Sequence, residues 1–117
     1  MLLTEPSVTF RSVDLLDSDS VLSLGTDFEA IYHLAAIVGV EHVLEQPYRV
    51  LIDNSCMLKN VISLVQKQSR LSRLLFSSSS EVYAGTLQYF SLPIPTPEKS
   101  KLAVTSLERP RTAYMLS

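Results

Sequence analysis

Three groups of residues follow segments with the composition of β-strands, and their positions suggest ligand binding. They are Asp14, the pair Ala35 and Ala36, and the serine run Ser77–Ser80. In an open α/β sheet, ligands bind in the crevice beyond the carboxyl ends of the strands. We therefore expect these residues to share one binding edge. Two simpler interpretations stay open, in which the serine run is a polar strand end and Asp14 caps the helix that follows it.

The composition excludes several other kinds of site. Cys56 is the single cysteine, which rules out an intrachain disulfide and a cysteine-based zinc cluster. Two histidines, His33 and His42, are too few for a histidine-rich metal site, so we expect no metal. The three glycines are too far apart to form a Gly-x-x-Gly-x-x-Gly phosphate loop.

Alternating strand and helix patterns would position the candidate residues. Residues 8–13, 30–36 and 73–78 have strand composition, and the last two are nearly continuous apolar runs, typical of central parallel strands covered on both faces. A short helix is predicted to begin at Asp17, and an amphipathic helix is predicted over residues 48–67. This order predicts an α/β fold with a doubly wound parallel sheet.

Residues 84–111 interrupt this alternation. They contain four prolines, which exclude regular helix where they occur, so we predict a long loop of the kind that is usually functional. Residues 112–117 have the pattern of a helix that is just beginning.

Length and charge limit the class of protein. A chain of 117 residues, 46% apolar and 19% charged, forms at most one domain, here residues 1–117, and is not intrinsically disordered. Ten Lys and Arg against twelve Asp and Glu predict no nucleic-acid partner. Its apolar runs are far shorter than the ~20 residues that cross a bilayer, and no signal peptide is apparent. We expect a cytoplasmic protein that has no membrane partner.

Four motifs in register resemble the extended short-chain dehydrogenase/reductase family. They are His33–Ala36, Asn54, Ser77–Tyr83 and Arg109–Ser117. Within that family the chain is most similar to the NAD-dependent epimerase/dehydratase group, which acts on nucleotide sugars. The resemblance implies a partial Rossmann-like domain that lacks the first strand–helix–strand unit and the C-terminal substrate domain.

The resemblance also implies NAD as the cofactor, with NADP as the alternative. In that family, residues matching Asp14 and Leu15 contact the adenine, and small residues such as Ala35 line the cofactor near the adenosine ribose and pyrophosphate. The asparagine at Asn54 matches one that fixes the active-site framework. The full set that the resemblance assigns to the cofactor is Asp14, Leu15, Leu34, Ala35, Ala36, Asn54, Ser77 and Tyr114.

Three residues match catalytic positions of the family. Ser79 matches the residue that hydrogen-bonds the reacting sugar oxygen, and Tyr114 matches the acid/base tyrosine of the Tyr-x-x-x-Lys motif. Glu81 matches a glutamate that handles a second proton in GDP-sugar 4,6-dehydratases and UDP-glucuronate decarboxylases. The substrate implied by the resemblance is a nucleotide sugar.

Two family motifs are absent from the 117 residues: the glycine-rich loop and the lysine four positions after the tyrosine. We therefore interpret the chain as an internal fragment of such an enzyme, one that forms only part of the cofactor wall and is inactive alone. The alternative is a non-catalytic binding or subunit-interaction module, with a homodimer formed through the helix over residues 48–67.

Overall fold

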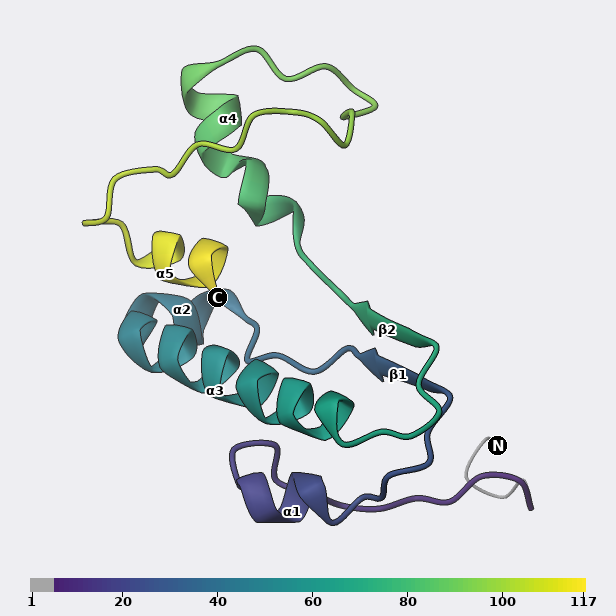
Figure 1. Ribbon diagram of the computed structural model, residues 1–117. Coiled ribbons are helices and arrows are strands. Elements are labelled where there is room, and N and C mark those ends of the chain that lie inside the picture. Colours follow the sequence, from purple (N-terminus) through teal and green to yellow (C-terminus); the bar gives the residue numbers. More distant parts are fainter. Residues whose placement is uncertain (1–5) are drawn as a thin grey trace.

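The computed structural model describes residues 6–117 as a mixed α/β structure (Figure 1). In chain order its elements are α1 (Ser18–Leu22), β1 (Ala30–His33), α2 (Val40–Glu45), α3 (Pro47–Gln66), β2 (Arg73–Phe76), the 3-10 helix η2 (Ser80–Tyr83), α4 (Ala84–Tyr89) and α5 (Pro110–Leu116). The long helix α3 lies against α1, α2, α5 and β1, and so forms the centre of the structure.

Strands β1 and β2 pair in parallel, as predicted. Ala30 lies opposite Arg73, and His33 lies opposite Phe76. Both strands are shorter than predicted, and every residue of β2 is exposed. The expected coverage of both faces and the doubly wound arrangement are therefore not found within residues 6–117, where one parallel pair packs on α3.

The strand predicted over residues 8–13 is wrong. This segment forms neither strand nor helix, and Phe10 is 72% exposed. The prediction rested on β-branched and aromatic composition, which describes a residue suited to a half-buried sheet surface. A strand also requires a neighbouring backbone with free N–H and C=O groups, and no described strand pairs with these residues.

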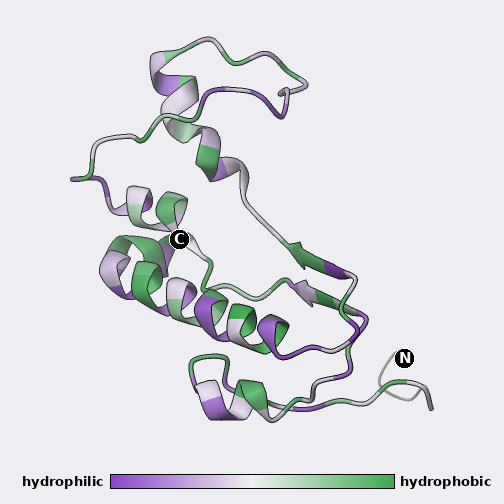
Figure 2. Cartoon of the chain, viewed as in Figure 1, coloured by the Kyte–Doolittle hydropathy of each residue, from purple (hydrophilic) through white to green (hydrophobic). Residues whose placement is uncertain are grey.

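The predicted amphipathic helix is confirmed as α3, within a residue at each end. Its buried apolar residues Val50, Met57, Val61 and Leu64 follow the three-and-four spacing of one helix face. Figure 2 shows hydrophobic and hydrophilic residues alternating around this helix, as that spacing requires. Within residues 6–117, no helix combines the length and apolar character needed to cross a membrane.

The short helix predicted to begin at Asp17 is also confirmed, as α1. The Asp17 carboxylate accepts a hydrogen bond from the backbone N–H of Asp19 at 3.2 Å and another from the Ser20 hydroxyl. These bonds favour the charged carboxylate, so the pKa of Asp17 lies below its ordinary value. The cap satisfies N–H groups that the first helical turn cannot satisfy by itself.

The loop predicted over residues 84–111 is only partly correct. Residues 84–89 form α4, because the prolines begin at Pro93 and do not affect the segment before it. Pro110 starts α5 instead of preventing it, since the first turn of a helix does not use that N–H. Residues 90–109 extend away from the sheet as an excursion between α4 and α5 (Figure 1).

Candidate functional site

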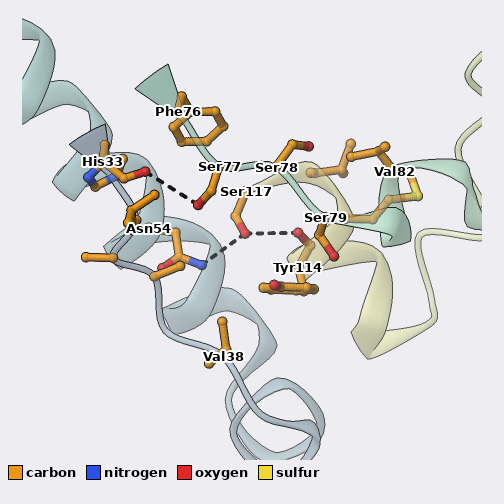
Figure 3. Close-up of a pocket in the computed structure, with 15 residues that line it drawn as sticks. His33, Val38, Asn54, Phe76, Ser77, Ser78, Ser79, Val82, Tyr114 and Ser117 are labelled. Atoms are coloured by element: carbon orange, nitrogen blue, oxygen red, sulfur yellow. Dashed lines mark hydrogen bonds between the residues drawn. The ribbon is translucent and has the colours of Figure 1, made fainter. Parts of the chain in front are cut away.

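A cavity of about 390 Å³ lies where β1 and β2 end (Figure 3). Its walls come from the loop after β1, from α3, from the serine run after β2, and from α5. The predicted site residues that line it are Leu34, Ala35, Ala36, Asn54, Ser77, Ser79 and Tyr114. The fold therefore gathers residues that are widely separated in the sequence, at the strand ends where the sequence predicted a ligand.

Ser79 lies at the start of η2, on the wall of this cavity. Its Oγ accepts a hydrogen bond from the backbone N–H of Glu81 at 3.3 Å and so caps the 3-10 helix. Because this bond uses a lone pair, the hydroxyl proton stays free to be donated. Ser79 can therefore donate to an oxygen atom of a ligand while it holds the backbone around it.

Tyr114 also lines this cavity, in the middle of α5, and is half-buried. One turn later, the Ser117 hydroxyl donates to the Tyr114 carbonyl oxygen at 3.0 Å and accepts from Asn54 Nδ2 at 3.1 Å (Figure 3). These two bonds attach the end of α5 to α3. The Tyr114 ring is thereby presented to the same space as Ser79.

Asn54 is buried, and its side-chain amide organises this end of the cavity. Its Oδ1 accepts from the backbone N–H of Ile37 at 2.7 Å, and its Nδ2 donates to the Ile37 carbonyl at 3.3 Å. Together with the bond to Ser117, these contacts join the loop after β1, α3 and α5. Asn54 thus acts here on protein backbone and on Ser117.

Asp14 and Leu15 lie outside the cavity. The Asp14 carboxylate accepts from the backbone N–H of Leu16 at 2.9 Å, and its carbonyl accepts from the backbone N–H of Asp17 at 3.2 Å. The Leu15 carbonyl accepts from Asn60 Nδ2 at 2.9 Å. Both residues therefore shape the turn before α1, and their contact with adenine stays a prediction.

Glu81 also lies outside this cavity, in the wall of a second one of about 520 Å³. Its carboxylate forms an ion pair with the Arg111 guanidinium. Met115 lines both cavities, so the two adjoin at α5. A ligand touching Ser79, Tyr114 and Glu81 together would have to reach from one cavity toward the other.

His33 and Phe76, the last residues of β1 and β2, also line the first cavity. Their rings stack with centroids 5.6 Å apart, and His33 is only 6% exposed. Burial disfavours the charged imidazolium, so the pKa of His33 lies below its ordinary value. His33 is thus a packed residue of β1. Within residues 6–117, no cluster of metal ligands is found.

Asn60 and Ser117 are structural partners that the sequence analysis missed. Asn60 is buried on α3 and donates to the carbonyls of Leu15 and Leu16, at 2.9 and 3.2 Å. Its signal was an asparagine close to the apolar stripe of the predicted helix, since buried amides require partners. Ser117 offers no comparable signal, because only the tertiary contact with Asn54 gives it a role.

The lining fits one part of NAD better than another. Ala35 and Ala36 let a ligand approach the backbone closely, and the hydroxyls of Ser77, Ser78 and Ser79 match the hydroxyl groups of a ribose. None of the residues that line the cavity is a lysine or arginine. The lining residues therefore suit a hydroxyl-bearing group such as a ribose, and they offer a phosphate group no cation.

Comparison with known proteins gives the same assignment as these motifs. The chain is 29% identical over 79 residues to a UDP-N-acetyl-alpha-D-glucosaminuronate decarboxylase from Bacillus cytotoxicus. The aligned part is 68% of this chain and 24% of the relative, so the chain spans about a quarter of that protein's length. No solved structure matches. The sequence pattern of the NAD dependent epimerase/dehydratase family matches residues 2–117, and the chain therefore belongs to that family.

Proposed function

We propose that this chain is part of an enzyme that uses NAD-mediated hydride transfer to transform a nucleotide sugar, by epimerisation, 4,6-dehydration or decarboxylation. The observation that carries the proposal is the shared cavity, where Ser79 and Tyr114 converge with Ala35 and Asn54. Family membership supports the choice of cofactor, and the matched relative's name supports a nucleotide-sugar substrate.

In this proposal, Ser79 and Tyr114 act on the sugar carbinol. Bound NAD supplies the hydride acceptor. The Ser79 hydroxyl donates to the reacting sugar oxygen and orients it, and the Tyr114 phenol exchanges a proton with that oxygen. Ala35 and Ala36 lie beside the ribose, while Asn54 keeps their loop in position through Ile37.

We further propose that the 117 residues alone do not turn a sugar over. A phenol is a poor base at neutral pH unless a cation stands beside it. No lysine or arginine lines the cavity around Tyr114, and none of the three glycines forms part of a phosphate loop. Weak binding without catalysis is the expected behaviour.

Calorimetric titration of the purified chain with NAD tests binding, and NADP provides the comparison. Tyr114→Phe and Ser79→Ala are expected to lower the affinity for NAD. Tyr83→Phe is the matched control, because Tyr83 lies outside the first cavity. Equal titration curves for all four proteins would contradict the assignment of the cavity.

A turnover assay tests the second part of the proposal. The chain is incubated with NAD and a panel of UDP- and GDP-sugars, and products are separated by chromatography. The expected result is no epimer, 4-keto sugar or decarboxylated product. Product formed by the isolated chain, and abolished in Tyr114→Phe, would show that the 117 residues are catalytically complete.

A second candidate function is a subunit-interaction module, favoured by the outer face of α3. Tyr48, Ile52 and Ile62 on this helix are 78%, 64% and 41% exposed. Exposed apolar side chains on one helix face favour association with a partner, here a second copy. Light scattering should then report a dimer that Ile52→Glu dissociates, whereas Ser91→Glu, at an exposed serine outside α3, should leave it unchanged. A monomer at all concentrations would eliminate this candidate.

A further inference from the structure

The two cavities share a wall, and that wall carries the proposed catalytic pair. It consists of η2 and α5, which pack against each other. Ser79 and Tyr114 line the first cavity, Glu81 and Arg111 line the second, and Met115 lines both. The ion pair between Glu81 and Arg111 therefore lies behind the surface that holds Ser79 and Tyr114.

This ion pair joins two elements that are 30 residues apart in the sequence. Among the ion pairs of the described residues, it is the one that connects α5 to another part of the fold. An arginine suits this task because its guanidinium offers several donors in a fixed plane. The Glu81 carboxylate is the less exposed partner, with 27% of its side chain accessible against 59% for Arg111.

Two polar contacts of α5 with other elements stand on either side of Tyr114, which lies midway between them. Arg111 stands three residues before Tyr114, and Ser117 stands three residues after it. Residues three apart on a helix lie on neighbouring turns. Arg111 attaches the first turn to Glu81, and Ser117 attaches the end to Asn54. With both contacts formed, the helix can neither rotate nor swing without breaking one of them.

We propose that Arg111 is a positioning residue, which pairs with Glu81 and thereby holds Tyr114 against Ser79. The importance of this geometry rests on the proposed function, in which both residues act on one sugar oxygen. In this proposal Glu81 holds Arg111 at the second cavity, in addition to any role it has with a substrate.

The test compares charge-removing variants of the full chain by NMR, without any ligand. Arg111→Gln and Glu81→Gln should shift the Tyr114 ring signals in the same direction, and the double variant should shift them no further. Amide exchange over residues 112–117 should accelerate by up to roughly fivefold, as expected for a partly exposed ion pair. Arg109→Gln is the matched control, because Arg109 lines the same cavity but hydrogen-bonds to Gln88 at 3.0 Å instead of to Glu81.

A charge-reversed pair separates positioning from a general loss of structure. Glu81→Arg combined with Arg111→Glu should return the Tyr114 signals toward those of the parent, whereas each reversal alone should shift them most. Tyr114 signals that do not respond to Arg111→Gln, or that respond equally to Arg109→Gln, would overturn the proposal. These results do not depend on NAD, so a chain that binds no NAD would overturn the proposed function and leave the positioning role standing.

Discussion

Two irregular segments flank the cavities, the loop of residues 34–39 and the excursion of residues 90–109, and they are held in different ways. The loop is fixed from a distance by Asn54 of the long helix, through both backbone groups of Ile37. The excursion is closed by its own flanks. The Thr86 hydroxyl donates to the Lys101 carbonyl at 2.6 Å, and the Thr112 hydroxyl donates to the Ser106 carbonyl at 2.7 Å.

The difference indicates which segment depends on the whole fold. The loop after β1 keeps its shape only while α3 is packed in place, because its anchor belongs to that helix. The excursion carries its anchors beside it in the sequence, so it can be altered without disturbing α3. We therefore expect global effects from changes at Asn54 and local effects from changes at the neck of the excursion.

The largest effect is expected from Asn54→Ala. The truncation leaves the N–H of Ile37 without its partner and removes the donor to Ser117. Buried groups left unsatisfied cost about 1–3 kcal/mol each, so the free energy of unfolding should fall by roughly 2–4 kcal/mol. Urea denaturation measures it, with Ser55→Ala as the exposed control. If Asn54→Ala and Ser55→Ala lowered the free energy of unfolding equally, the loop of residues 34–39 would not depend on Asn54 as stated.

Gly85→Ala should be the next largest, and its effect should be local. A Cβ atom at Gly85 would lie 1.7 Å from the carbonyl oxygen of Ala103, which is backbone and must move. Such overpacking typically costs about 1–3 kcal/mol. The NMR signals of residues 101–105 should shift, while those of residues 34–39 should not. Ser91→Ala, within the excursion, is the control, and shifts spread evenly over the chain would contradict the local closure.

Thr86→Val should have a smaller effect at the same neck. Thr86 is 2% exposed, and valine keeps its shape but cannot donate to Lys101. The expected loss is about 1 kcal/mol. Thr96→Val is the matched control, since its hydroxyl bond to the Pro93 carbonyl, at 3.2 Å, is exposed. Amide exchange across the neck of the excursion compares the two variants, and equal rates would show that burial of the Thr86 bond is irrelevant.

The smallest effect is expected from His33 and depends on pH. Burial lowers the pKa of His33 below its ordinary value of 6.5, so the unfolded chain takes up the proton first as the pH falls. The stability contributed by neutral His33 is therefore complete above pH 6.5 and declines as the pH drops below it. Urea denaturation at several pH values measures the free energy of unfolding. Between pH 8 and low pH, this free energy should fall less for His33→Gln than for the parent chain. An unchanged decline would show that His33 is not the responsible group.

The two helix predictions that succeeded rest on contacts close in sequence. The helix over residues 48–67 follows from the spacing of its own apolar residues, and α1 follows from the cap at Asp17. The rule that parallel strands end at one edge predicted that Asp14, Ala35 and the serine run would meet. Ala35 and Ser79 line one cavity, but Asp14 does not, because residues 8–13 form no strand. Tyr114 was expected from the family resemblance, and the packing of α5 brings it to the same cavity. The loop prediction extends over α4 because it rests on the prolines, which begin only after this helix ends.

The residue pattern alone predicted the long helix, which depends on residue types within a few positions. Four motifs in register pointed to the family whose sequence pattern matches residues 2–117. Three features depend on the tertiary structure: whether residues 8–13 pair with a strand, which cavity Glu81 lines, and which hydrogen bonds close the excursion. Those outcomes depend on backbone and side-chain partners that lie up to tens of residues away. Local propensity describes what a segment can form, and the distant partner decides whether it does.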